Sequence, residues 1–510
     1  MSVQTFRYSP HANRANEINW HEWGNAAFDA AGTDRLVFLH LTTVWSRQCQ
    51  RMDEEAFSNP DVIALLNGSV IPVRVDADRL PHVQDRYIAG GWPTNALLTP
   101  TGEVLWAATY VTADDLLRVC RDVLNAWSQR REELTTEIER RRRALEAARG
   151  RHTPVGLVRR EPADDVLNAI TQAFDRRNGG FGDAPKFVEA EAVELLQVLG
   201  AGGDTEAMLM ATHTLDGMLA GELQDPVDGG FFRYALECDW TRPRCEKLLS
   251  VNAGLIEVYA RGAVQQDRSD WRAVVERTVT WADTVMQRSD GLWNASQADH
   301  DTWYALDAAG RARTAPPRID TTLYTNVNAR WIAALANAGR MLACEEWVAR
   351  AARALDTLTS AMQTPEGVFA HYRVDGGEPQ IDFLLIDTLA VADAAMALAE
   401  ADAGAEWVGR TRELARTLER CFWADDGGFW ERRRSPHDVG ALRYRERPFE
   451  PNALAARLLV RLANATGERG PRARAERVLA VLSQGAARYG VAGATFALAV
   501  EEFFDGARMR

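Results

Sequence analysis

One short stretch of the chain gathers four charged side chains that could do chemistry together. Asp228, Arg233, Glu246 and Lys247 place two carboxylates and two cations between positions 228 and 247 of the 510-residue sequence. A pair of carboxylates can act as general acid and general base on a glycosidic bond, and their separation sets the stereochemical outcome. Local ion pairing at a helix end is the alternative explanation. We predict Asp228 and Glu246 as catalytic residues and Arg233 and Lys247 as ligand-binding residues.

Other polar and aromatic residues lie beside repeated glycine turns, where they could line a common pit. His371 and Asp387 complete the predicted catalytic set, because a 2-epimerase needs a proton-transfer pair that histidine commonly supplies. The remaining binding candidates combine carboxylates, a cation and aromatic rings: Lys186, Phe187, Tyr234, Trp240, Asp299, Asp320, Asn328 and Glu450, with Asp301, Phe232 and Trp430 beside them. Any single carboxylate among them could instead stabilise a turn.

Cys49 is a separate candidate for thiol chemistry. Residues 36–41 have the composition of a buried strand, and the segment from Cys49 to Leu66 has the apolar spacing of a helix. At a helix N-terminus the dipole and the unpaired N–H groups favour a thiolate. Pro93 is the candidate for a cis-proline that faces this cysteine. A cysteine buried in the helix is the other interpretation.

The remaining cysteines and the overall charge restrict the possible partners. The six cysteines are scattered without a CxxC pair, so we expect no disulfide framework, no metal and no cofactor. A net charge of −13 argues against a nucleic-acid partner or an anionic membrane. Residues 1–10 lack the pattern of a secretory signal, and no apolar run reaches the roughly 18–20 residues of a spanning helix. We therefore expect a cytoplasmic protein.

The elements that position Cys49 follow one another in the thioredoxin order. Strands are expected at 36–41, 70–75 and 96–98, with a turn through Pro93 and a helix that starts near Thr112. This order predicts a thioredoxin-like domain over residues 1–127. A charged helical linker over 128–160 is expected to follow it.

The rest of the chain reads as long amphipathic helices punctuated by one kind of turn. An acidic or amide residue, glycine and an aromatic residue recur with first glycines at positions 179, 229, 291, 367 and 427, and Gly490 marks a weaker sixth copy. Each step leaves room for two helices, so the repeat predicts six helical hairpins closed into a ring. We expect an (α/α)6 toroid over 161–510, similar to six-hairpin glycosidases and N-acylglucosamine 2-epimerases.

Several motifs together carry a resemblance that covers most of the chain. They are YSPHAN at 8–13, NWHEWG at 19–24, GGWP at 90–93, GGFGDAPKF at 179–187 and DGGFFRY at 228–234. In this order they resemble the thioredoxin-domain-containing family of spermatogenesis-associated protein 20 and its bacterial relatives. The resemblance implies a thioredoxin-like domain followed by a six-hairpin toroid.

The chain departs from that family at the residues that would do redox chemistry. The family's loop usually reads Cys-His-Trp-Cys, and the aligned residues here are Ser46-Arg47-Gln48-Cys49. Because Ser46 replaces the attacking cysteine, we expect dithiol exchange to be lost. Three hypotheses stay open: carbohydrate-related chemistry on a sugar-like ligand in the toroid, mixed disulfides between Cys49 and a thiol partner, and a non-catalytic binding or scaffold protein.

Overall fold

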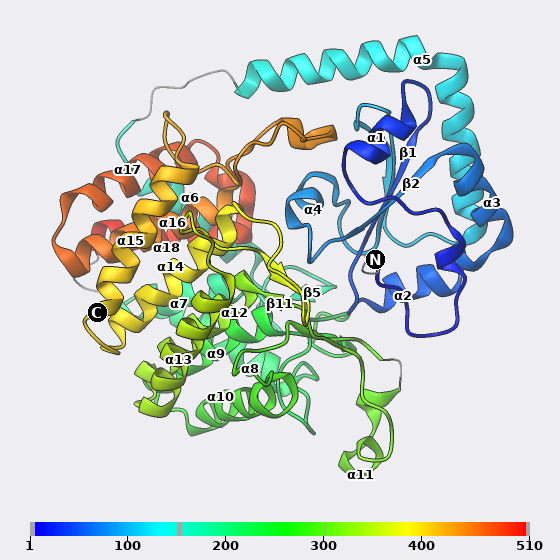
Figure 1. Ribbon diagram of the computed structural model, residues 1–510. Helices are drawn as coiled ribbons and strands as arrows, with labels where there is room; N and C mark the ends of the chain where they lie inside the picture. Colours follow the sequence, from blue (N-terminus) through cyan, green and yellow to red (C-terminus); the bar gives the residue numbers. More distant parts are fainter. Residues whose placement is uncertain (1–5, 150–155, 301, 506–510) are drawn as a thin grey trace. The chain divides into compact units, whose positions relative to one another are not determined.

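The structure is a computed structural model that describes residues 6–149, 156–300 and 302–505. The chain forms two compact units. The first comprises Met1–Pro154 and Arg434–Arg445, and the second comprises Val155–Arg433 and Glu446–Arg510. Figure 1 shows a strand-containing first unit and a second unit built mainly of helices.

The first unit is built on a four-stranded sheet with the order β2-β1-β3-β4. Its strands are β1 (Val37–Thr42), β2 (Ile71–Asp76), β3 (Thr94–Leu98) and β4 (Val104–Ala108). Strand β1 runs parallel to β2 and antiparallel to β3, and β4 runs antiparallel to β3. The helices are α1 (Asn25–Ala31), α2 (Arg47–Glu54), α3 (Pro60–Ser69), α4 (Pro81–Tyr87) and α5 (Ala113–Arg149). This arrangement confirms the predicted thioredoxin-like fold.

The side chains of β1 alternate between two apolar layers, as expected for a strand covered on both faces. Phe38 packs in a cluster with residues of α2, α3 and α5, whereas Leu39 and Leu41 pack in a second cluster with residues of α1 and α4. Helix α5 continues from the domain into the predicted charged linker and leaves helical geometry only at Arg130.

Residues 434–445, which we call the strap, complete the second of these layers. Val439 and Leu442 are 5% and 4% exposed and pack with residues of α1 and α4. The Ala441 N–H donates to the Tyr87 hydroxyl at 2.8 Å, and that hydroxyl donates to the Gly102 carbonyl at 2.9 Å. The sequence places these residues in the second domain; the structure corrects this, because their apolar side chains are buried in the first unit.

The second unit is a closed ring of helical hairpins. Within the described residues the inner helices contact one another in sequence, and the last contacts the first: α7 (Ala190–Ala201), α9 (Leu249–Gln265), α12 (Thr325–Met341), α14 (Leu385–Glu400), α16 (Phe449–Thr466) and α18 (Ala494–Asp505). Each packs against an outer helix: α8 (Thr205–Ala220), α10 (Ser269–Trp281), α13 (Glu345–Met362), α15 (Glu406–Phe422), α17 (Arg469–Ser483) and, for α18, α6 (Glu161–Ala173). The predicted (α/α)6 toroid is confirmed.

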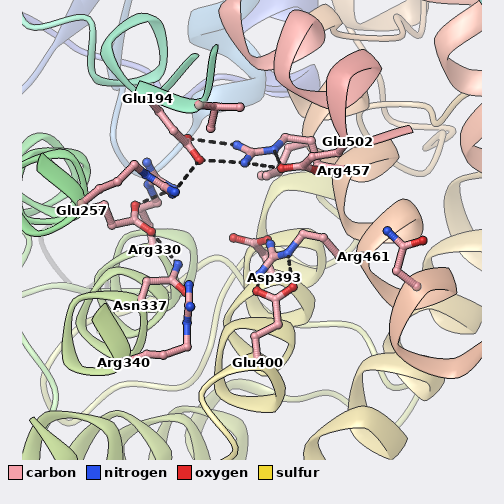
Figure 2. A pocket seen from close by; sticks show the side chains of 14 residues that line it. Glu194, Glu257, Arg330, Asn337, Arg340, Asp393, Glu400, Arg457, Arg461 and Glu502 are labelled. Atoms are coloured by element: carbon pink, nitrogen blue, oxygen red, sulfur yellow. Dashed lines mark hydrogen bonds and ion pairs between the residues drawn. The ribbon is translucent and has the colours of Figure 1, made fainter. Parts of the chain in front are cut away.

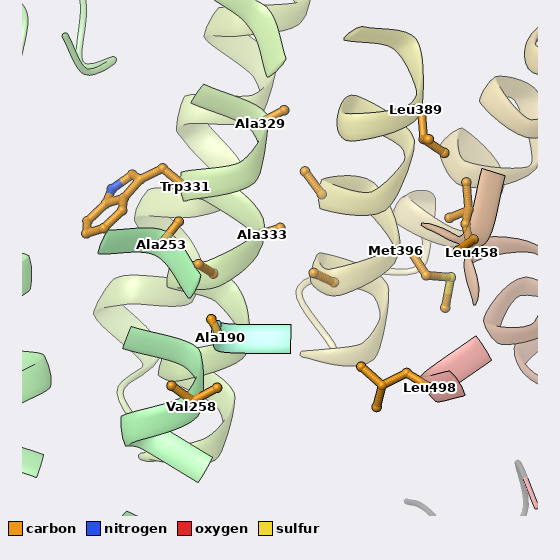
Figure 3. Close-up of a cluster of buried hydrophobic side chains, with 14 of the residues drawn as sticks. Ala190, Ala253, Val258, Ala329, Trp331, Ala333, Leu389, Met396, Leu458 and Leu498 are labelled. Carbon is orange, nitrogen blue, oxygen red and sulfur yellow. The ribbon is translucent and has the colours of Figure 1, made fainter. Parts of the chain in front are cut away.

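Small side chains let the inner helices pack closely. Ala190, Ala253, Ala329 and Ala333 are buried between them, and larger residues such as Trp331 fill the space toward the outer helices (Figure 3). Such interdigitation of small and large side chains is what a densely packed core requires. The buried faces therefore hold the ring together.

The connections differ at the two ends of the ring. Short turns follow the C-termini of the inner helices, for example 202–204 and 342–344. Long connections precede their N-termini and contain α11 (Ala308–Arg311) and short strands: β5 (Lys186–Phe187), β6 (Tyr234–Ala235), β7 (Pro243–Arg244), β8 (Lys247–Leu248), β9 (Ser296–Gln297), β10 (Ile319–Asp320), β11 (Leu323–Tyr324) and β12 (Tyr372–Arg373). We call these the short-turn end and the long-loop end.

The repeated glycine turns all lie at the long-loop end, and the structure explains their composition. Gly180 and Gly230 have positive φ angles of 77° and 71°, and an added Cβ would lie 2.4 Å from Trp240 and 2.7 Å from Trp281. Only glycine fits such a turn pressed against a ring. The next aromatic residue is fixed through its backbone by a polar side chain of an inner helix, as Phe231 is by Asn252.

Candidate functional site

The charged stretch predicted from the sequence forms two separate groups at the long-loop end. In the first group, Lys247 Nζ contacts Asp225 at 2.6 Å and the Gly229 carbonyl at 2.7 Å. Arg311 bridges Asp225 at 2.8 Å and Asp228 at 2.7 Å. Burial opposes the charge of Asp225, but the hydrogen bonds and charges of Arg311 and Lys247 outweigh it and hold its pKa below the usual range. This group stabilises a repeat turn.

Lys186 has the same arrangement in the preceding repeat. Its Nζ contacts Asp175 at 2.5 Å and the Gly179 carbonyl at 2.8 Å, and its side chain is fully buried. Lys186 and Lys247 each donate to an aspartate and to a glycine carbonyl of their own turn. This arrangement is therefore a structural feature that the two repeats share. The sequence did not reveal Asp225 and Arg311. Asp225 had only its position close to a glycine turn as a signal, and Arg311 had none.

The second group is a stack that ends at an exposed aromatic ring. Phe187 on β5 and Tyr234 on β6 are cross-strand partners, and their rings stack at 4.7 Å between centroids with an angle of 23°. The Arg233 guanidinium lies 4.5 Å from the Tyr234 ring and pairs with Glu246 at 2.6 Å. Phe187 is 42% exposed, whereas Glu246 is almost completely buried. We call these four residues the aromatic platform.

A half-buried thiol and a half-buried phenol lie close to the acidic end of the platform. Desolvation raises the pKa of Cys245 to about 12, and the charges of Asp299 and Glu246 contribute to this shift. Burial also raises the pKa of Tyr304, with Cys245 and Asp225 acting in the same direction. Both groups are therefore neutral at physiological pH, and neither serves as a nucleophile in this state.

His371 and Asp387 meet in a buried pair. The two carboxylate oxygens of Asp387 lie 2.9 and 3.0 Å from Nδ1 of His371, and the side chains are about 0–2% exposed. Burial raises the pKa of Asp387, and the charge of His371 opposes this shift. A carboxylate at Nδ1 orients an imidazole and fixes its tautomer. The Tyr324 ring lies 5.8 Å from that of His371.

The other predicted residues hold the long connections in place. Asn328 exchanges two hydrogen bonds with the Trp293 backbone, Trp240 donates to the Asn178 carbonyl, and Asp320 accepts from the Tyr324 hydroxyl. Phe232 is buried, and Glu450 is exposed in the first turn of α16. Asp301 lies outside the described residues. The structure thus groups the predicted residues into the turn network, the platform and the His371–Asp387 pair.

The axis of the ring contains a cavity of about 140 Å³ that the sequence analysis did not anticipate. Charged residues of the inner helices line it (Figure 2): Arg261, Arg330, Arg340, Arg457 and Arg461, with Glu194, Glu257, Asp393, Glu400 and Glu502. Arg457 bridges Glu194 and Glu502 at 2.9 and 2.7 Å, and Arg461 contacts Asp393 at 2.7 Å. None of the predicted site residues is among its lining residues.

These pairs determine what the axial cavity can do. The arginines hold the carboxylates in ion pairs, so the cavity lacks the two free carboxylates expected of a glycosidase. Its volume is also below the roughly 300–1,000 Å³ typical of ligand pockets for larger molecules. The only sequence signal for it was charge recurring at four-residue spacing on one helix, as in Arg457 and Arg461.

In the first unit, Cys49 lies inside helix α2 and is 1% exposed. Ser46 caps this helix and accepts the Cys49 N–H at 3.4 Å. Burial raises the pKa of the Cys49 thiol, and hydrogen bonds from Thr43 and Ser46 only partly offset this. The Trp92–Pro93 peptide bond is cis, as predicted for Pro93, and the Trp92 ring lies 5.4 Å from that of Trp45. Of the two interpretations of Cys49, the structure agrees with the cysteine buried in the helix.

We therefore expect Cys49 to resist alkylation in the folded protein. At neutral pH, iodoacetamide should label Cys49 at least about 100-fold more slowly than Cys238, because only a solvent-exposed thiolate reacts. Cys238 is exposed and provides the control within the same chain. Mass spectrometry of peptides from timed samples measures both rates. Equal labelling of the two cysteines would contradict the buried thiol.

Comparisons with known proteins agree with both units. The family model Thioredox_DsbH, described as a protein of unknown function (DUF255), matches residues 6–146. Spermatogenesis-associated protein 20 of Rattus norvegicus is 30% identical over 317 residues, which cover 56% of this chain and 39% of the relative. The chain is thus similar to this family over the matched residues. The human protein matches with the same identity over 312 residues. The alignments thus span about two fifths of the length of these relatives.

Solved structures agree with the fold of the second unit. Cellobiose 2-epimerase from Bacillus thermoamylovorans B4167 superposes with a TM-score of 0.50 at 12% identity, over 62% of this chain and 85% of the epimerase. A sugar epimerase from a ruminal bacterium gives 0.50 at 14% identity, over 62% and 84%. At such identities the similarity establishes the fold alone. Within the described residues, no group of His, Cys, Asp or Glu side chains is arranged to hold a metal, and no helix is long and apolar enough to cross a membrane.

Proposed function

We propose that the second unit binds a sugar-like polyol at its long-loop end, with His371 and Asp387 as an acid–base pair. The aromatic platform is the observation that carries this proposal. An exposed ring next to an arginine offers an apolar face for C–H groups and a guanidinium for hydroxyl groups, and the buried Glu246 holds that guanidinium in place. The resemblance in fold to sugar epimerases is consistent with this ligand class.

For the first unit we propose a binding or structural role without dithiol exchange. Ser46 occupies the attacking position, and a serine hydroxyl cannot exchange disulfides. The burial of Cys49 also disfavours a mixed disulfide with a thiol partner. All six cysteines are free, which is compatible with a reducing compartment, and we propose the cytoplasm.

A binding experiment on the full chain tests the platform. Monosaccharides and disaccharides, including glucose, mannose and cellobiose, are screened by thermal shift and then by calorimetry. We expect Phe187→Ala and Tyr234→Ala to weaken the binding of the best ligand by about 2- to 12-fold, because stacked rings contribute about 0.5–1.5 kcal/mol beyond their buried area. Phe504→Ala removes a similarly exposed ring on α18 and should leave affinity unchanged.

The same screen separates an enzyme from a binding module. Incubation of the bound sugar in D2O, followed by nuclear magnetic resonance, detects deuterium at C2 if a proton-transfer pair acts there. Binding without exchange or turnover supports a binding protein. If no sugar binds, or if the platform variants bind as well as the wild type, the proposal fails.

A further inference from the structure

The short-turn end of the axial cavity has a cluster of hydrogen-bond donors without acceptors. Arg340, in the last turn of α12, is exposed, and its side chain forms no ion pair or hydrogen bond with any residue that the structure describes. Arg261 reaches Glu194 through one terminal nitrogen at 3.3 Å, but its buried Nε has no partner. The Asn464 amide, on α16, is likewise without a partner among the described residues.

The carboxylates nearest to this cluster are already engaged. Glu400 receives two hydrogen bonds from Arg461, at 3.0 and 2.8 Å. Glu257 accepts from Asn337 at 2.6 Å and pairs with Arg330 at 3.3 Å. The carboxylates of Glu400 and Glu257 are therefore already paired, whereas Arg340 and the Nε of Arg261 have no acceptor among the described residues.

The charge at Arg340 is correspondingly under-compensated. The part of Arg340 that lies in the cavity wall is desolvated, which lowers its pKa. The charge of Glu400 opposes this shift, and the charges of Arg261 and Arg461 act in the same direction as the desolvation. The pKa values of Arg330 and Arg461 are instead raised by their acidic partners, despite burial. A cation in the last turn also interacts favourably with the helix dipole, but this does not account for the orphaned Nε of Arg261.

We propose that the short-turn end of the toroid binds a small oxyanion of the phosphate type, held by Arg340 and Arg261 with Asn464 as a neutral donor. A guanidinium presents parallel N–H groups that match two phosphate oxygens. The cavity of about 140 Å³ admits a phosphate group with a few waters. This site lies at the opposite ends of the inner helices from the aromatic platform, so it goes beyond the sugar site and does not depend on it.

Titration of the full chain with sodium phosphate at constant ionic strength tests this site. We expect a saturable rise in melting temperature and a matching calorimetric isotherm, since a ligand that binds only the folded state stabilises it. Arg340→Gln should weaken phosphate binding at least 10-fold. Arg416→Gln removes an exposed arginine of outer helix α15 that has no partner in the described chain, and it should bind like the wild type.

Two further arms distinguish the source of the anion and guard against misfolding. If glucose 6-phosphate binds more tightly than phosphate and loses affinity in Arg340→Gln, the natural ligand is a phosphate ester. If phosphate binds more tightly than glucose 6-phosphate, the ligand is the free ion. Arg261→Gln is the second variant and should also weaken binding. The proposal is overturned if phosphate gives no more shift than chloride, if both variants bind normally, or if glucose alone reproduces the effect.

Discussion

Replacing Asp225 by Asn should lower the free energy of unfolding of the second unit by about 3–5 kcal/mol, the loss typical when one partner of a buried ion pair is removed. Asp225 and Lys247 are fully buried, and Arg311 is 4% exposed. Asparagine can still accept the Val227 N–H that Asp225 accepts at 3.0 Å, so the turn keeps this hydrogen bond. The buried charge of Lys247, however, would lose its counterion.

Asp228→Asn is the matched control for this prediction. Asp228 contacts the same Arg311 but is 29% exposed, so its loss should change stability by less than about 1 kcal/mol. Urea unfolding of the full chain, followed by far-ultraviolet circular dichroism, measures both variants. A similar loss of unfolding free energy in the two variants would contradict the prediction. It would mean that the ion pair of the partly exposed Asp228 stabilises the unit as much as the buried pair of Asp225.

The second large effect is expected in the strap. Leu442→Ala should destabilise the first unit by about 2–5 kcal/mol, because it removes a buried side chain from the layer that covers α1 and α4. Hydrogen–deuterium exchange of the full chain should show faster exchange in β2 and α4, while the inner helices of the toroid keep their protection. Unchanged exchange would mean that the strap does not stabilise this layer.

Arg443→Ala controls for a general effect of mutation in the strap. Arg443 directly follows Leu442 but is exposed, so its truncation should stay within about 0.5 kcal/mol of the wild type. The comparison of Leu442→Ala with Arg443→Ala separates the loss of a buried apolar side chain from a general effect of mutation on the flexibility of the strap.

The sequence was sufficient for the architecture because the architecture depends on local signals. Each glycine turn requires positive φ next to an aromatic ring, and the spacing of these turns leaves room for a helical hairpin. The position of Cys49 after an apolar strand likewise marks the thioredoxin order. These features involve neighbouring residues and can be read without knowledge of long-range contacts.

The partners of the charged residues could not be read in the same way. Arg311 reaches Asp225 across 86 positions of the chain, and Arg457 reaches Glu194 across 263. The sequence identified Lys247 as charged and close to other charges, but only the fold pairs it with Asp225. Burial of Cys49 similarly depends on packing from several elements. The sequence did not predict that the strap packs in the first unit, because two apolar residues in a loop, Val439 and Leu442, form no periodic pattern.

The strap also bears on how the protein is made. Strand β4 ends at Ala108 and the strap begins at Arg434, so 325 residues are translated between the sheet and the segment that completes its apolar layer. At about 5–20 residues per second, this interval lasts roughly 15–65 s. Throughout it, the layer over α1 and α4 lacks Val439 and Leu442. Completion of this apolar layer therefore awaits synthesis of most of the toroid.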